Sequence, residues 1–169
     1  MIQRIQTVFL FLVAVCMIAM VFSTIWEKES IEKQEKATLT ALYLSHYTID
    51  SDAENPTYTV LAEKPSYFIA IVAVISAIVA LYSIFQYKNR MTQMKLGLLN
   101  IFLIAASLGL SIFYMYQGEA LIELASGGVI RGTYKIGIFL PALALLFNSM
   151  ANRFIKKDED LVRSVDRIR

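Results

Sequence analysis

The stretch "IQTVFLFLVAVCMIAMVFSTIW", residues 5–26, contains 22 residues and no charged side chain. An α-helix rises 1.5 Å per residue, so about 20 apolar residues cross a hydrocarbon core of ~30 Å. This stretch is therefore long enough for one membrane-spanning helix. It is about twice as long as the apolar core of a secretory signal peptide, and no clear small-residue cleavage site follows it. We therefore expect an uncleaved first span.

The same pattern recurs along the chain, which is 57% hydrophobic and 18% charged. Three further stretches lack charged residues, and they cover residues 65–87, 96–118 and 136–152. The last is short, but Lys135 and Arg153 at its ends can extend their charges to the two membrane surfaces. The sequence predicts a single membrane domain over residues 1–169, and its four spans cover about residues 6–26, 66–87, 96–117 and 135–154.

The distribution of Lys and Arg predicts the threading of these spans. One side of the membrane holds Arg4, the loop "KNRMTQMK" (residues 88–95) and the tail, residues 155–169. The other side holds the loop 27–65, whose residues 27–64 contain eight acids and four lysines. Cytoplasmic loops carry the excess of basic residues. We therefore expect both termini in the cytoplasm and the loop 27–65 outside it.

The outer loop contains two strand candidates. "TLTALYLSHYTI" (residues 38–49) alternates apolar and polar residues, and "TYTVLA" (residues 57–62) is rich in strand-forming types. "DSDAENP" between them has turn chemistry. We predict a small extracytoplasmic β-hairpin, and the residues expected to order it include Leu39, Tyr43, Tyr58 and Val60.

The chain ends in a charged stretch with helical periodicity. Asp158, Glu159 and Asp160 precede an apolar stripe that consists of Leu161, Val162, Val165 and Ile168. This pattern predicts a short cytoplasmic amphipathic helix, which is too short to be stable alone. We expect it to fold back so that its acids lie near the basic residues Lys88, Arg90 and Lys95, or to bind a protein partner. The complete prediction is an all-α membrane protein, a four-transmembrane-helix bundle with that hairpin and that tail helix.

The predicted spans contain almost no ionisable residues. No Asp, Glu or His lies within them, and Lys and Arg occur only at their ends, which argues against a pump, a coupled transporter or a haem carrier. Cys16 and His46 are the only residues of their types and lie on different segments, so we expect no metal and no cofactor. We also identify no catalytic residues and expect no nucleic acid partner. Asn100 and Asn148 are expected to make polar contacts between helices.

Several stretches resemble a known family. "MIQRIQTVFLFL", "KNRMTQMKLGLLN" and above all "LALLFNSMANRFIKKDEDLVRSVDRIR" are similar to an uncharacterised four-span membrane protein family of Bacteroidota, domain of unknown function 4293. The resemblance spans nearly the whole chain and is weakest in the outer loop. It implies a multi-pass protein of the bacterial inner membrane, and it assigns no activity, cofactor or functional residue.

These observations lead to two expectations about function. The first is a non-enzymatic accessory or scaffold subunit of a membrane assembly, in contact with membrane lipids and with a possible protein partner at the cytoplasmic tail. The alternative is a membrane protein that binds a small molecule or a lipid in a cavity between its spans. A polar-lined gap between the helices would favour the alternative, and a solid bundle would favour the first.

Overall fold

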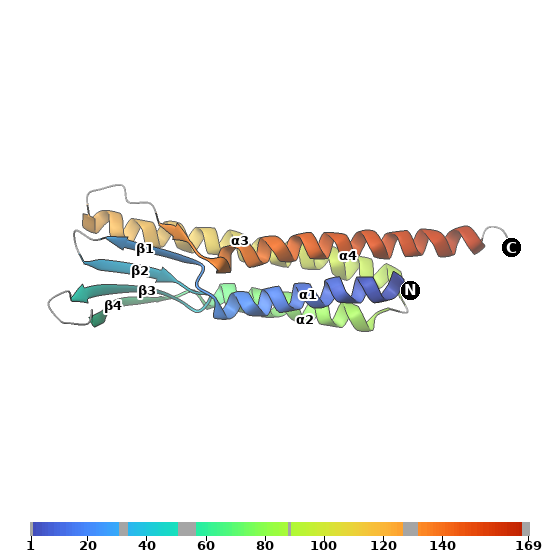
Figure 1. Cartoon of the computed structure of the whole chain (residues 1–169), viewed down its shortest axis with the longest axis horizontal. Coiled ribbons are helices and arrows are strands. Elements are labelled where there is room, and N and C mark those ends of the chain that lie inside the picture. The colour runs from blue at the N-terminus through green and yellow to red at the C-terminus, as the bar shows by residue number, and fades with distance from the viewer. Residues whose placement is uncertain (1, 31–33, 51–56, 88, 127–131, 167–169) are drawn as a thin grey trace.

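The structure is a computed structural model, and it describes residues 2–30, 34–50, 57–87, 89–126 and 132–166. Within these residues four helices lie side by side, and a five-stranded sheet lies at one end of them (Figure 1). The helices are α1 (Ile2–Phe22), α2 (Tyr67–Phe85), α3 (Arg90–Ser126) and α4 (Ile136–Asp166). The strands are β1 (Trp26–Ser30), β2 (Glu35–Leu39), β3 (Tyr43–Asp50), β4 (Thr57–Pro65) and β5 (Thr133–Tyr134).

Each of the four helices contains a segment long and apolar enough to cross a membrane. By length and composition, the chain therefore fits a membrane protein. In the bundle α1 and α3 each pack against both α2 and α4. Small residues let helices approach closely, and they dominate the buried face of α2, which includes Ala70, Ala73, Ser76, Ala77, Ala80 and Ser83. Both chain termini lie at the end of the bundle opposite the sheet (Figure 1), and we call these two ends the terminal end and the sheet end.

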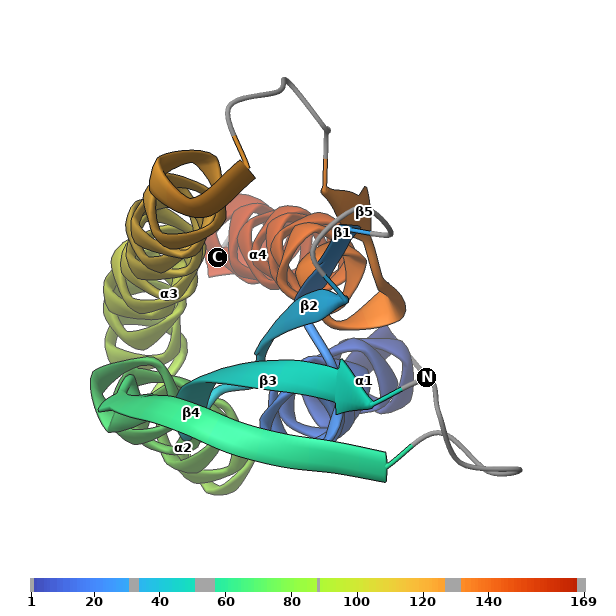
Figure 2. The ribbon, with the colours of Figure 1, turned by 90° about the vertical axis from the view of Figure 1, so that its left-hand side faces the viewer.

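The prediction of an all-α protein with a small hairpin is wrong. The structure has a five-stranded antiparallel sheet with the strand order β4-β3-β2-β1-β5. The expected hairpin strands do pair, as β3 and β4, but they form only one side of this sheet. Seen from the sheet end (Figure 2), the sheet crosses the ends of the helices, with β4 over α2 and with β1 and β5 beside α4.

The three strands outside the predicted hairpin, β1, β2 and β5, carry weak sequence signals for a clear physical reason. The buried face of β1 consists of Trp26, Lys28 and Ser30, so its alternation is hidden by a charged and a polar residue. β2 buries only Ala37 and Leu39. β5 has two residues and comes from a distant part of the chain, so it is too short to show a period-two alternation of apolar and polar residues. Period-two reasoning recognises half-buried strands only when their inner face is apolar.

The residues expected to order the hairpin differ in burial. Leu39 is fully buried, whereas Tyr43, Tyr58 and Val60 are each at least 50% exposed. Leu39 lies on the inner strand β2, while Tyr58 and Val60 lie on the edge strand β4. The core of the outer region is therefore formed by the inner strands of the sheet.

Helix α3 supports the sheet. The third span was expected to end near residue 117, but α3 continues to Ser126 and packs against β1 and β2. Its outer part contains Glu119, Ala120 and other good helix formers. A Cβ at Gly118 would lie 2.9 Å from the ring of Trp26 and 3.1 Å from Leu44. Gly118 thus allows the helix to approach the buried face of the sheet.

The tail does not form the separate helix that the sequence predicted. Helix α4 continues without interruption to Asp166, so the expected tail helix forms the last turns of the fourth helix. No Gly or Pro lies between Arg153 and Asp166, so the sequence offers no reason for a break. Leu161 and Val162 remain exposed, and the chain's described residues do not cover them.

Candidate functional site

Polar side chains gather inside the bundle toward its terminal end. We call this group the polar cluster, and it consists of Gln6 on α1, Ser76 and Ser83 on α2, Gln93 and Asn100 on α3, and Asn148 and Asn152 on α4. All except Asn152 are at most 5% exposed. A buried polar side chain in a membrane helix is costly unless it is hydrogen-bonded. The cluster is thus the most polar part of the bundle interior among the described residues.

Three hydrogen bonds connect the helices within this cluster. The Ser76 hydroxyl donates to Asn100 Oδ1 at 2.7 Å, which joins α2 to α3. The Gln93 side-chain amide donates to the Ser83 carbonyl at 3.1 Å and joins the same two helices. Asn148 Nδ2 donates to the Gly97 carbonyl at 2.8 Å, which joins α4 to α3. Asn100 and Asn148 each bond to another helix, but they do not bond to each other.

The hydrogen-bonding capacity of the cluster is only partly used by the protein. Five buried atoms in it have no protein partner: Gln6 Nε2, Ser83 Oγ, Asn100 Nδ2, Asn148 Oδ1 and Asn152 Oδ1. The amide nitrogens are donors, the amide oxygens are acceptors, and the hydroxyl serves as either. Because an unpartnered buried polar group costs about 1–3 kcal/mol, these atoms favour a small polar molecule or water as partner.

Sequence reasoning identified only Asn100 and Asn148 in this cluster. The other members carry a recognisable signal. Gln93, Gly97 and Asn100 are spaced i, i+4 and i+7, which places them on one face of α3. Asn148 and Asn152 are likewise four residues apart on α4. Polar residues at helical spacing within apolar spans are the signal by which a polar interior face could have been recognised.

The structure brings together one acid–base pair of the residues predicted at the tail. Arg90 Nη2 lies 3.1 Å from Asp158 Oδ2, and Arg90 Nη1 donates to the Asp158 carbonyl at 3.0 Å. Lys95 and Asp160 are exposed and make no ion pair with each other or with other described residues, while Glu159 is partly buried. Lys88, Ile168 and the side chain of Val165 lie outside the described residues.

The sheet has two different edges. At the β5 side Glu27 binds Lys36 at 2.7 Å and Lys135 at 3.2 Å. The hydrogen bond from Lys36, opposed in part by burial, and the weaker contribution of Lys135 lower the pKa of Glu27. Backbone hydrogen bonds from Lys135 to Ile25 and from Gly137 to Thr24 fasten the start of α4 beside α1. β5 is thus held to β1 by contacts within the chain.

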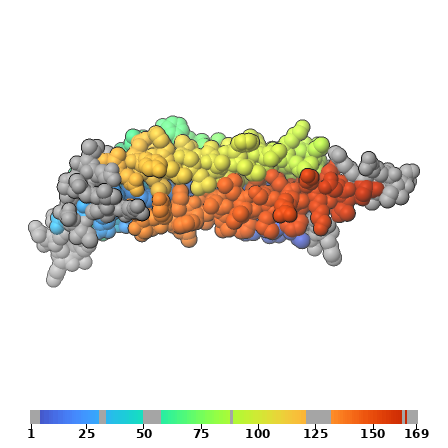
Figure 3. Space-filling view, turned by 90° about the horizontal axis from the view of Figure 1, so that it is seen from above, coloured from blue at the N-terminus to red at the C-terminus, as the bar shows by residue number. Residues whose placement is uncertain are grey.

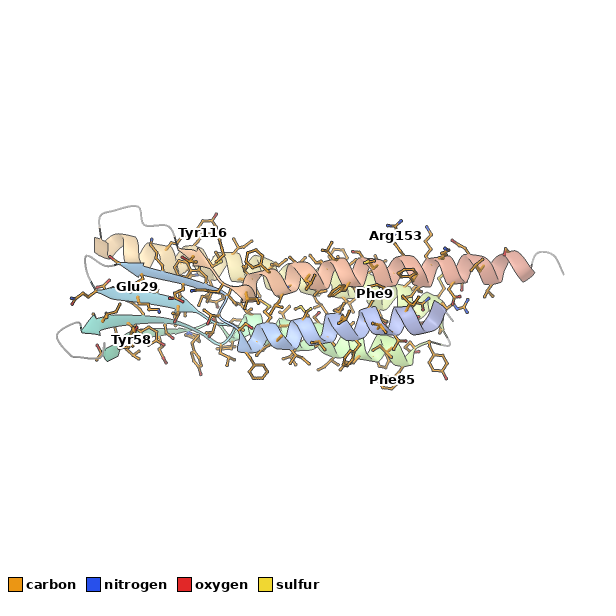
Figure 4. All side chains as sticks on the ribbon, in the orientation of Figure 1. Phe9, Glu29, Tyr58, Phe85, Tyr116 and Arg153 are labelled. Carbon is orange, nitrogen blue, oxygen red and sulfur yellow. The ribbon has the colours of Figure 1, made fainter. Side chains whose placement is uncertain are left out.

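The β4 edge is open. Residues 58–65 of β4 are all exposed, and Val60 and Leu61 are each 55% exposed. The register of β4 against β3 shifts between His46 and Tyr47, so Leu61 is an extra residue in β4. On either side of this shift, successive residues point to opposite faces of the sheet, so both faces of β4 are exposed as well as its outer edge. Tyr58 lies near the outer end of this strand (Figure 4). At the membrane-proximal end, Lys64 donates a hydrogen bond to Gln117 of α3.

Clusters of metal-binding residues do not occur in the described parts of the chain, where no three His, Cys, Asp or Glu residues lie together. His46 instead lies 3.2 Å from Glu35 on the neighbouring strand. Cys16 is buried on α1.

No curated protein matches the chain. The family described as domain of unknown function 4293 matches residues 2–168, which is nearly the whole chain and includes all four helices and all five strands. The match confirms the resemblance seen in the sequence. The protein therefore belongs to the DUF4293 family.

Proposed function

We propose that the protein is a non-enzymatic, multi-pass protein of the bacterial inner membrane that acts as an accessory or scaffold subunit. In this proposal both termini are cytoplasmic and the sheet is extracytoplasmic. The open β4 edge carries the proposal, because an uncovered edge strand offers a row of backbone donors and acceptors to another chain. The exposed apolar side chains of Tyr58, Val60 and Leu61 add contact area along that strand.

The partner that fits this edge is an extended segment of a different protein. β4 leads directly into α2, so it runs towards the membrane. A second copy in the same membrane has the same orientation and presents its β4 in the same direction. An antiparallel pair between two copies would require one of them to be inverted in the membrane. A segment of another chain that runs away from the membrane has no such restriction, and it extends the antiparallel sheet by a sixth strand.

Site-specific photo-crosslinking in the native host tests this function. A photoreactive residue at Val60 should give a discrete adduct with one other protein, whereas the same probe at exposed Tyr43, on the interior strand β3, should not. Thr59→Lys should weaken the adduct, because charged side chains oppose edge pairing. An adduct with a second copy, or equal labelling from both positions, would contradict the proposal.

Cysteine labelling tests the threading separately. A cysteine at residue 54 should react with an impermeant reagent added to cells whose outer membrane has been permeabilised, and a cysteine at residue 92 should not. The opposite pattern would reverse the proposed orientation.

The polar cluster favours a second candidate function, the binding of a small polar molecule between the helices. Its five unpartnered atoms are the specific observation. If these atoms have only a structural role, Asn148→Leu should leave stability unchanged or raise it, because burial of an apolar side chain replaces a poorly satisfied amide. If they bind a molecule, the same change should abolish the stabilisation that native membrane extract gives to the purified protein.

A further inference from the structure

A cavity of about 360 Å³ lies on α4 near the terminal end, and its described lining residues are Met150, Arg153, Phe154 and Lys157. These four residues are spaced i, i+3, i+4 and i+7, so they share one face of the helix. Phe154 stacks on Phe9 of α1 with ring centroids 5.6 Å apart, which fixes one wall of the cavity. Figure 4 shows Arg153 extending outward from α4, on the side of the helix away from α1.

The two cations in this cavity are available for an anion. Arg153 and Lys157 are exposed and form no salt bridge with any described residue. Asp158, the nearest acid in the sequence, is bound by Arg90 through both its carboxylate and its carbonyl. That carboxylate therefore does not compete for Lys157.

The height of these cations matches a membrane surface. Lys135 precedes α4, and at 1.5 Å per residue Arg153 and Lys157 lie about 27 and 33 Å further along the axis. A hydrocarbon core is ~30 Å thick. With Lys135 at one surface of the membrane, the two cations lie at the level of the headgroups on the other surface.

An apolar track leads from the cavity into the membrane. Phe139, Leu143, Leu146 and Met150 lie on the same face of α4 as the two cations and are between 41% and 63% exposed. From Phe139 to Met150 the track is about 16 Å long, close to half the thickness of a hydrocarbon core. Figure 3 shows α4 uncovered along the length of the molecule, beside α3.

We infer that this face of α4 is a specific site for one anionic phospholipid of the leaflet at the terminal end. Arg153 and Lys157 bind its phosphate, and one of its acyl chains lies along the track below Met150. The charge of the two cations and the apolar track together favour a phospholipid over a free anion, because a free anion gains nothing from the track. The site lies at the opposite end of the molecule from the β4 edge and is independent of the proposed scaffold role.

Brominated lipids provide a direct test with the full-length protein in nanodiscs. The chain has a single tryptophan, Trp26, which is buried at the sheet end and gives a constant background. A second indole introduced by Met150→Trp reports on the acyl chain at the track. At equal mole fraction, brominated phosphatidylglycerol should quench this indole more strongly than brominated phosphatidylcholine.

Three substitutions that each remove one positive charge, made in the Met150→Trp protein, identify the site. Arg153→Gln and Lys157→Gln should each weaken the preference for phosphatidylglycerol about fivefold, the effect of one basic residue near an anionic surface. Lys156→Gln is the matched control, because Lys156 is exposed on the same turn but does not line the cavity. The conservative change Arg153→Lys should retain the preference.

Each alternative outcome would overturn the inference. Equal quenching by the two lipids would show no selective site. If Lys156→Gln weakened the preference for phosphatidylglycerol as much as Arg153→Gln does, the result would show only diffuse attraction to an anionic surface. Displacement of the lipid by millimolar inorganic phosphate would show a site for free anions. Each variant should be monodisperse in detergent before reconstitution, so that a folding defect is recognised.

Discussion

Arg90, the first residue of α3, binds both the carboxylate and the backbone carbonyl of Asp158 on α4, at 3.1 and 3.0 Å. This double contact joins the beginning of one helix to a point near the end of another at the terminal end of the bundle. Among the described residues, it is the ion pair that joins the predicted tail, residues 155–169, to the start of α3. Beyond it, α4 continues to Asp166.

Arg90→Gln should loosen the last turns of α4. Both side chains are partly buried, and an ion pair of this kind contributes about 0–1 kcal/mol. Hydrogen exchange of residues 158–164 should therefore accelerate by up to about fivefold, while the membrane-embedded part of α4 stays unchanged. Lys95→Gln is the control, since Lys95 is exposed and unpaired among the described residues. Equal effects of the two substitutions would mean that the contact with Asp158 contributes nothing specific.

Gly97→Ala should destabilise the contact between α3 and α4. An added Cβ would overlap the side-chain amide of Asn152 on α4. Overpacking of this kind costs about 1–3 kcal/mol, which detergent unfolding of the purified protein can measure. Gly109→Ala is the matched control on the same helix, because no atom lies within 4 Å of its added Cβ.

A double substitution identifies the cause of the destabilisation expected from Gly97→Ala. Asn152→Ala removes the atoms that the new Cβ would meet, so Gly97→Ala combined with Asn152→Ala should be more stable than Gly97→Ala alone. If the second substitution adds to the damage, the overlap with Asn152 is not the cause.

The outer sheet should lose stability in acid through Glu27. Its pKa is lowered from an ordinary value of 4.5 chiefly by the hydrogen bond from Lys36. The folded state therefore favours the ionised carboxylate, and this stabilisation is complete above the unfolded pKa. It is lost as the pH falls from about 4.5 through the lower folded value.

Denaturant titrations at several pH values, followed by the fluorescence of Trp26, measure this effect, because Trp26 is adjacent to Glu27 and fully buried. Glu27→Gln should lower stability at neutral pH and flatten the acid dependence. Glu29→Gln, on the exposed face of the same strand, should retain that dependence. An identical pH profile for Glu27→Gln and the parent would assign the acid sensitivity to other groups.

Leu39→Ala should destabilise the outer sheet by about 2–4 kcal/mol, because Leu39 is fully buried and its truncation leaves a cavity. Val60→Ala on the exposed edge strand should cost less than about 1 kcal/mol. The rate of limited proteolysis in the outer region is a suitable measurement. Comparable rates for the two variants would contradict the assignment of the core to the inner strands.

The helices could be predicted because their signal is local. Uncharged runs such as residues 5–26 identify a membrane helix from length alone. Their ends were less predictable, because the signal that defines a span is apolarity and a helix does not stop where apolarity stops. Residues 118–126 and 155–166 are charged or mixed, yet they extend α3 and α4.

The sheet was less predictable, because its pairings depend on distant parts of the chain. Lys28 faces inward on β1, so the strand lacks an apolar period-two pattern. The pairing of Trp26 with Tyr134 joins distant parts of the sequence. Within the bundle, Asn100 stood out as polar in an apolar run, but its partner Ser76 did not, since serine is common in membrane helices.

The length of helix α3 sets how far the sheet lies from the bilayer core. Its 37 residues span about 55 Å, of which a bilayer core accounts for ~30 Å. About 25 Å remains for the two ends together, and the larger part carries the sheet. Because Gly118 has no side chain, Trp26 packs directly against this helix, and the sheet cannot tilt without moving α3. In the proposed scaffold role, this spacing restricts the partners of β4 to chains that pass close to the membrane surface.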